Sequence, residues 1–243
     1  MENTIINKPA ISIQGLFKSF GRNLVLRDIN LDIYHGERIT IFGPNGAGKS
    51  TLIKILAMLT KPDFGQINIL GYNLESKPQN IRQLIGVVTH KTFLYEDLTG
   101  YENLAFYAKM FGLNNIRERI DAVTSKMGIQ FRVDRKIGTL SHGMKKRFSI
   151  ARSLLHDPLI LLLDEPDGGL DQHALAMLDT LVVNSEGIPR TILLTTHNLD
   201  IGINFSNKIG IISNNSIIYL NTTKNMDLNT FKQIYIEHTG FEV

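Results

Sequence analysis

The sequence predicts an α/β fold that is built on a parallel sheet and carries an α-helical insert. The apolar run Arg38–Phe42 leads through a glycine-rich loop into the helical pattern Leu52–Leu59, which makes a strand–loop–helix unit. The continuous apolar run Leu159–Leu163 is typical of a central parallel strand covered on both faces. Between these runs, residues 99–131 carry two consecutive helical patterns without an intervening strand, and this predicts the insert.

Composition narrows the class of protein. The charged residues make up 20% of the chain and the hydrophobic residues 43%, as in ordinary globular domains, and no apolar run is long enough to span a membrane. Cysteine is absent, which excludes disulfides, thiolate metal sites and a cysteine nucleophile. The net charge of +3 is spread along the chain without a long basic block, so we expect no nucleic-acid partner.

The glycine-rich loop matches the phosphate-binding pattern G-x-x-x-x-G-K-[ST], with the residues Gly43, Pro44, Asn45, Gly46, Ala47, Gly48, Lys49, Ser50 and Thr51. The glycines let successive backbone N–H groups point at phosphate oxygens, and the positive end of the following helix adds to the attraction. We expect Lys49 to reach the β- and γ-phosphates and the Ser50 hydroxyl to bind Mg²⁺. A glycine-rich turn without a ligand is the alternative, but all the fixed positions of the motif are filled. The loop therefore predicts a nucleotide site.

Two strands are expected before this loop, at Ile11–Phe17 and Val25–Ile33, with a turn over Phe20–Asn23. Phe20 offers a flat apolar face on which an adenine ring could stack. It could equally be an ordinary core or hairpin phenylalanine, and spacing leaves both interpretations open.

Two shorter strands, Gln66–Leu70 and Leu84–Thr89, are expected after the loop helix, and His90 follows the second. Ligand sites of open α/β sheets lie at the carboxyl ends of the strands. His90 could therefore contact the γ-phosphate, the attacking water or Mg²⁺, or it could be a surface histidine.

The helical insert is expected to begin at Thr99, which forms a capping box with Glu102, and to continue in a second helix over Ile116–Met127. A strong helix follows, with Ser141 as its N-cap and His156 near its end. Its free N–H groups beside Gly143 make a second anion-binding terminus, although any helix start needs such a cap.

The lysine and arginine residues of this helix, Lys145, Lys146 and Arg147, are expected on a solvated face.

Two carboxylates end the apolar strand Leu159–Leu163. Neighbouring residues of a strand point to opposite sides, so Asp164 can bind Mg²⁺ in its outer shell while Glu165 acts as the general base for an attacking water. His197 ends the next buried strand, Thr191–Thr196, where it can donate to a γ-phosphate or be incidental.

Turn-forming residues shape the rest of the second half of the chain. After the acidic strand, Gly168–Asp171 is expected to form a turn, with Asp171 capping the next helix. A hairpin is predicted over Ile209–Leu220, and Asn221–Val243 carries no clear pattern.

The ordered set of these motifs resembles the ATP-binding subunit of ABC transporters across nearly the whole chain. The segment Leu140–Met144, between the phosphate loop and the acidic strand, separates that family from other phosphate-loop ATPases. The resemblance implies a P-loop NTPase with a RecA-like core, an antiparallel β subdomain and an inserted helical subdomain at about residues 90–156. It places the nucleotide-binding domain at residues 11–236 and a C-terminal tail at 237–243.

The resemblance also implies a head-to-tail dimer of two copies that sandwich two ATP molecules with Mg²⁺. Each ATP would contact the phosphate loop of one copy and the signature of the other, formed by Ser141, His142, Gly143 and Met144. Phe20 then corresponds to the adenine-stacking aromatic, His90 to the Q-loop position, Asp171 to the D-loop and His197 to the switch histidine. The expected partners are integral membrane permease subunits, at the cytoplasmic face of the membrane, to which this subunit would bind peripherally.

The chain departs from the family pattern at three places. Leu-Ser-His-Gly-Met replaces LSGGQ in the signature, His90 replaces the Q-loop glutamine, and Asp167-Gly168 replaces the Thr-Ser that usually precedes Gly-Leu-Asp. Together with residues 140–158 as a whole, these changes resemble the heme exporter subunit of cytochrome c maturation systems. We therefore expect an ATPase that drives heme export for cytochrome c biogenesis. The alternatives are an exporter of a drug, lipid or polysaccharide, a soluble ABC ATPase acting on ribosomes or DNA, and a regulatory module that hydrolyses nothing.

Overall fold

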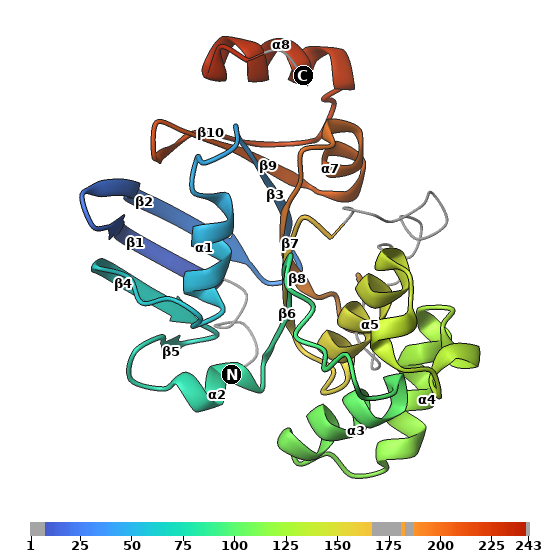
Figure 1. Ribbon diagram of the computed structural model, residues 1–243. Helices are drawn as coiled ribbons and strands as arrows, with labels where there is room; N and C mark the ends of the chain where they lie inside the picture. Colours follow the sequence, from blue (N-terminus) through green and yellow to red (C-terminus); the bar gives the residue numbers. More distant parts are fainter. Residues whose placement is uncertain (1–7, 167–180, 183–186, 242–243) are drawn as a thin grey trace.

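A computed structural model describes residues 8–166, 181–182 and 187–241 (Figure 1). Its strands are β1 (Pro9–Phe20), β2 (Asn23–Tyr34), β3 (Arg38–Phe42), β4 (Phe64–Ile69), β5 (Tyr72–Asn73), β6 (Ile85–Val88), β7 (Ile160–Asp164), β8 (Thr191–Thr195), β9 (Lys208–Ser213) and β10 (Ser216–Thr222). Its helices are α1 (Lys49–Leu56), α2 (Pro78–Arg82), α3 (Gly100–Met110), α4 (Ile116–Lys126), α5 (His142–Leu154), α7 (Leu199–Phe205) and α8 (Leu228–Thr239), with the 3-10 turns η2 (Gln130–Arg132) and η3 (Ile137–Thr139). Each helix in these ranges is too short or too polar to cross a bilayer.

The strands form two sheets, and the predicted α/β class is confirmed. The six-stranded sheet has the order β10-β9-β3-β8-β7-β6, in which β9, β3, β8, β7 and β6 run parallel and β10 pairs antiparallel with β9. The four-stranded sheet, β2-β1-β4-β5, is antiparallel and supplies the β subdomain that the resemblance implied. The hairpin predicted over Ile209–Leu220 is also confirmed, as β9 and β10.

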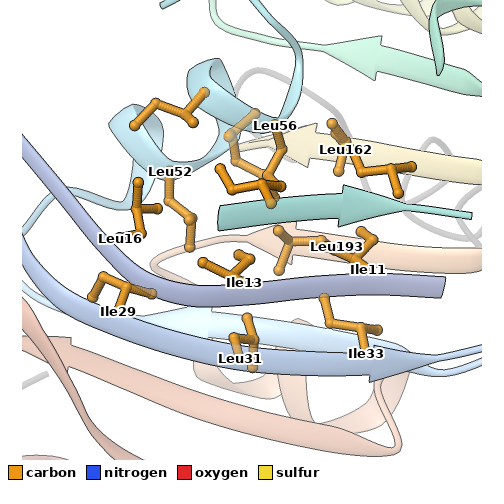
Figure 2. Close-up of a cluster of buried hydrophobic side chains, with 14 of the residues drawn as sticks. Ile11, Ile13, Leu16, Ile29, Leu31, Ile33, Leu52, Leu56, Leu162 and Leu193 are labelled. Atoms are coloured by element: carbon orange, nitrogen blue, oxygen red, sulfur yellow. The ribbon is translucent and has the colours of Figure 1, made fainter. Parts of the chain in front are cut away.

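Helix α1 lies between the two sheets (Figure 1). Figure 2 shows the apolar core that joins them, in which Leu52 and Leu56 of α1 meet Ile13 of β1 and Leu162 of β7. These side chains are almost fully buried, so the helix that follows the glycine-rich loop is held from both sides. Burial of apolar surface stabilises a fold by about 25 cal/mol per Å². This packing therefore holds α1, and with it the glycine-rich loop, in place between the two sheets.

The opposite side of the six-stranded sheet is covered by α5, with α3 and α4 beyond it (Figure 1). A second apolar cluster joins Leu104 of α3, Ile120 of α4 and Phe148 of α5 to Leu161 and Leu163 of β7. The predicted helical insert is confirmed. It shares its core with the sheet, because α5 packs directly against the strands.

Two predicted helix caps are confirmed by hydrogen bonds. The Thr99 amide donates to Oε2 of Glu102 at 2.7 Å, and the Glu102 amide donates to Oγ1 of Thr99 at 3.1 Å, which closes the capping box. Ser141 caps α5 and accepts from the Met144 amide at 3.4 Å. The local chemistry at these positions therefore starts both helices where the sequence predicted.

Helix α8 was not predicted from the sequence. It ends at Thr239, so the predicted boundary at residue 236 falls inside a helix. Its buried residues are Phe231 and Tyr235, and the Phe231 ring lies 4.9 Å from the Phe42 ring between centroids. Since Phe42 directly precedes the glycine-rich loop, α8 supports the strand that leads into it.

We expect Phe231→Ala to lower the free energy of unfolding by about 3–5 kcal/mol, because it leaves a cavity against Phe42. Ile236→Ala on the same helix is the matched control, since that side chain is 41% exposed and its loss should cost less than about 0.5 kcal/mol. Chemical denaturation of both variants measures the difference, and equal losses would show that α8 does not support β3.

His156 lies just after α5 and is largely buried, near the charged side chains of Arg152, Asp157 and Arg190. Its ring stacks on Phe111 with centroids 3.9 Å apart, and its Nε2 lies 2.9 Å from the Ile85 carbonyl oxygen, to which it donates. Burial lowers the pKa of His156 from 6.5 to about 4, the hydrogen bond to Ile85 opposes this effect, and the nearby Arg152 charge adds to it. The native protein therefore holds this ring neutral where the unfolded chain would protonate it.

This difference predicts that stability falls as the pH drops from 6.5 to about 4, because the unfolded state binds a proton that the native state does not. The upper limit of the effect is about 3 kcal/mol, at 1.36 kcal/mol per pKa unit. His156→Gln keeps a donor without titrating and should flatten the dependence in denaturation curves across this range. His35→Gln at an exposed histidine is the control and should leave the dependence intact.

Candidate functional site

The glycine-rich loop adopts a conformation that requires glycine at two positions. Gly43 has φ 152° and Gly48 has φ 105°. A Cβ at Gly43 would lie 2.2 Å from the Ile212 carbonyl oxygen, and one at Gly48 would lie 2.6 Å from the Leu26 side chain. Helix α1 begins at Lys49, and its N-cap Gly48 provides no side-chain hydrogen bond. The first N–H groups of the helix are therefore left for an anion.

Lys49 lies inside this loop and is only 5% exposed. Its Nζ donates to the carbonyl oxygens of Gly43 at 2.7 Å and Pro44 at 3.1 Å. Burial lowers the pKa of Lys49, while the negative charges of Glu165 and Asp164 act in the opposite direction. An ammonium group that has already lost most of its water binds a phosphate with a small further desolvation cost.

Asp164 reaches the same place because of strand register. On the neighbouring strands β7 and β8 it pairs with Thr195, whose Oγ1 donates to Asp164 Oδ1 at 2.8 Å. The Ser50 hydroxyl donates to the same oxygen at 2.9 Å. The predicted Mg²⁺ residues Ser50 and Asp164 are thus in direct contact.

This donor set fits Mg²⁺, which in proteins is usually held by one or two carboxylates, a hydroxyl, waters and substrate phosphates. Asp164 is 4% exposed and offers a carboxylate beside the Ser50 hydroxyl. Among the residues that the structure describes, no group of three or more His, Cys, Asp or Glu side chains forms a self-sufficient metal site. A divalent ion here would need the phosphates of a bound nucleotide as further ligands.

Glu165 and His197 form a second pair at this edge of the sheet. Nε2 of His197 lies 2.6 Å from Oε1 of Glu165, and both side chains are partly open to solvent. The Glu165 backbone has φ 48°, in the left-handed region, and its amide donates to the Thr195 carbonyl oxygen at 2.9 Å. Such a backbone conformation costs about 1–3 kcal/mol in a residue other than glycine, and it is common at functional sites.

His90 and Phe20 are both exposed in the described structure. His90 follows β6, which neighbours β7, so it stands at the same edge of the sheet as Asp164. Phe20 ends β1, is 52% exposed, and has Nζ of Lys18 5.2 Å from its ring centroid. Residues Val25 and Leu26, just after this turn, lie against Gly48, so the hairpin packs on the glycine-rich loop. Phe20 is therefore an exposed ring on the hairpin that packs on the loop, and its stacking on a base stays a prediction.

The signature residues lie at the start of α5. Ser141 and His142 are exposed, while Gly143 and Met144 are partly buried. Asp171, predicted to belong to the D-loop, and the preceding Asp167-Gly168 lie outside the described residues.

The expectation that Lys146 is solvated was wrong. This side chain is 4% exposed, and its Nζ donates to the carbonyl oxygens of Glu165 at 3.0 Å and Thr89 at 3.4 Å. Helical periodicity could have found it, because Lys146 lies three and four residues before the buried Ser149 and Ile150. Sequence reasoning also missed Thr195, for which two consecutive threonines at the end of an apolar strand were the only signal.

The fold and this edge of the sheet define a P-loop nucleotide-binding protein, in which a glycine-rich loop, a buried lysine and a serine–aspartate pair converge. The family model described as ABC transporter matches residues 26–168, and the chain belongs to that family.

Individual relatives agree with this assignment. The chain is 37% identical to the Nod factor export ATP-binding protein I of Rhizobium sp. (strain N33), over 79% of this chain and 64% of that protein, so it spans less than two thirds of that relative. It is 34% identical to the linearmycin resistance ATP-binding protein LnrL of Bacillus subtilis (strain 168), over 87% of this chain and 69% of that protein. Among solved structures, the dimeric ATP-binding cassette MJ0796, in a post-hydrolysis state bound to ADP and Pi, matches with a TM-score of 0.79 and 25% identity. That match covers 88% of this chain and 98% of the cassette.

We expect Lys49→Ala to weaken ATP binding by about 10- to 100-fold, since hydrogen bonds to charged groups contribute about 1.5–3 kcal/mol. Lys54→Ala is the matched control, because Lys54 lies on the same helix with its side chain exposed. Calorimetric titration with ATP in the presence of Mg²⁺ measures both, and an unchanged affinity in Lys49→Ala would exclude the loop as the phosphate site.

Proposed function

We propose that this chain is the ATP-hydrolysing subunit of an ABC exporter. The observation that carries the proposal is the contact of 2.6 Å between Glu165 and His197, at the sheet edge that also holds Lys49 and Asp164. A module that only bound nucleotide would have no use for a carboxylate held in this way. Similarity to a cassette solved after hydrolysis supports the same activity.

In the proposed reaction, the nucleotide phosphates are bound by the backbone N–H groups of the glycine-rich loop and by Lys49. Ser50 and Asp164 would hold Mg²⁺, which would supply positive charge to offset that of the phosphates. The oxygen of a water would form a bond to the γ-phosphorus while the bond from that phosphorus to the bridging oxygen breaks and ADP leaves. Glu165 would accept the proton of this water, and His197 fixes the direction of the carboxylate through its Nε2. Positioning and charge stabilisation account for most of the rate in this kind of phosphoryl transfer.

A second copy of the chain is the proposed partner at the nucleotide. The start of α5 exposes Ser141 and presents helix N–H groups, which is a terminus suited to phosphate. Figure 1 places α5 on the far side of the six-stranded sheet from α1 and its loop. Contact of Ser141 and Gly143 with a nucleotide held by another copy is the arrangement we propose, and the dimeric state of the similar cassette supports it.

Integral membrane permease subunits are the proposed partners at another surface, at the cytoplasmic face of the membrane. A groove of about 560 Å³ lies beside the segment that follows His90, and apolar and aromatic side chains including Ile85, Phe93 and Phe111 line it. Arg152 lines it too, with its guanidinium over the Phe93 and Tyr107 rings. Its Nη2 donates to the Val87 carbonyl oxygen at 2.7 Å, while its buried Nε has no hydrogen-bond partner among the described residues. These features suit an apolar segment of a permease that carries a carboxylate for Arg152.

The cargo we propose is a drug, lipid or polysaccharide rather than heme. The relatives carry names that refer to Nod factor export and to linearmycin resistance. Heme export for cytochrome c biogenesis is the second candidate. It rests on the signature Leu-Ser-His-Gly-Met and on His90, and the names of these relatives give it no support.

Purification of a tagged chain from membranes, followed by identification of the integral subunits that accompany it, separates these cargoes. A permease together with a heme-handling protein, and heme absorbance in the purified complex, would favour the second candidate. A permease without either would favour the first.

We expect Glu165→Gln to lower ATP turnover by at least about 100-fold, because it removes the general base. ATP binding should remain, and a nucleotide-bound dimer should accumulate in size-exclusion chromatography. Glu75→Gln at an exposed glutamate is the control and should hydrolyse ATP like the unmodified chain. Wild-type turnover in Glu165→Gln would remove Glu165 from the proposed role.

A further inference from the structure

Lys146 is a buried cation that the proposed chemistry does not use. It lies on α5, one turn beyond the cap at Ser141, and only 4% of it is exposed. Burial of an ammonium group costs several kcal/mol unless it is hydrogen-bonded. Lys146 is therefore held at this place by the groups that bond to its ammonium.

The carbonyl groups that Lys146 contacts belong to the ends of two neighbouring strands. Nζ donates to the Glu165 oxygen at 3.0 Å and lies 3.4 Å from the Thr89 oxygen. Glu165 directly follows β7 and Thr89 directly follows β6, and these strands pair in parallel. One side chain therefore ties the beginning of α5 to both strand ends, one of which leads into His90.

Lys146 binds the carbonyl group of Glu165, a residue whose backbone conformation is unfavourable. Glu165 holds φ at 48°, a region that disfavours residues with a Cβ. Its amide is fixed by the Thr195 carbonyl oxygen at 2.9 Å, and its own carbonyl oxygen is fixed by Lys146. The Glu165 backbone is thus bonded on both sides, and its side chain lies 2.6 Å from His197.

We propose that Lys146 is a positioning residue for ATP hydrolysis, which holds the Glu165 backbone in its left-handed conformation and connects it to the helix that begins at Ser141. The inference rests on the hydrolysis proposed above. Lys146 acts through the Glu165 backbone and does not touch the nucleotide. Since Ser141 would meet the nucleotide of the other copy, the same lysine links that contact to this chain's own general base.

The test uses Lys146→Met, which keeps the length and apolar stem of the side chain and removes its donors. We expect kcat for ATP to fall about tenfold, as for the loss of a hydrogen bond to a charged group, while ATP affinity stays within about twofold of that of the unmodified chain. Lys146→Arg keeps a charged donor and should recover most of the rate. Lys145→Met is the control, because Lys145 pairs with Glu96 at 2.8 Å on the surface and should leave kcat unchanged.

A second measurement needs no turnover. Hydrogen exchange at the Glu165 amide, followed by NMR without nucleotide, should be about tenfold faster in Lys146→Met than in Lys145→Met. Unchanged exchange with unchanged kcat would overturn the role of Lys146 while leaving the ATPase intact. A parallel loss of ATP affinity and kcat would also overturn it, since that pattern belongs to a binding residue. An unmodified chain that hydrolyses no ATP would overturn the proposed function itself, and the positioning role with it.

Discussion

The candidate site depends on the register of three neighbouring parallel strands. Asp164 on β7 pairs with Thr195 on β8, and Thr195 pairs with Ile41 on β3. Because β3 continues into the glycine-rich loop, this register brings the loop beside the Asp164 carboxylate and lets Ser50 and Thr195 donate to one oxygen. A slip of one residue would turn Asp164 to the other face of the sheet and separate the pair.

The charges at this edge are arranged before any ligand arrives. Lys49 is buried among loop carbonyls, and the negative charges of Asp164 and Glu165 offset part of its burial cost. A bound polyphosphate would neutralise the positive charge of Lys49, and a divalent ion bound with it would neutralise the negative charge of the carboxylates. Donors already held in place need little reorganisation during reaction, which is the main advantage of such a site. The left-handed backbone of Glu165 is the local conformational cost, and hydrogen bonds to Thr195 and Lys146 hold it in place.

Residues close together in the chain were predictable, and contacts between distant segments were less so. The range predicted for β3 was confirmed without a shift, and the capping box at Thr99 has both of its hydrogen bonds, since each rests on neighbouring residues. Helix α8 was missed because most of its surface is polar and its place depends on packing against residues far away in sequence. These include the ring of Phe42 and apolar side chains of α7 and β9. Lys146 was misplaced because a lysine in a run of three cations resembles a solvated face.

The sequence by itself determined the α/β class, the phosphate loop and the chemical types at the strand ends, because periodicity, turn chemistry and motif spacing are local properties of the chain. Only the tertiary structure decided which of these groups touch. Burial and strand pairing join Asp164 to Ser50 and Glu165 to His197, and they turn Lys146 inward to the Glu165 carbonyl. Ser50 and Asp164 are more than a hundred residues apart in the chain, and the partners in the other two contacts are about twenty to thirty residues apart. Over such separations no local sequence pattern specifies which partners meet.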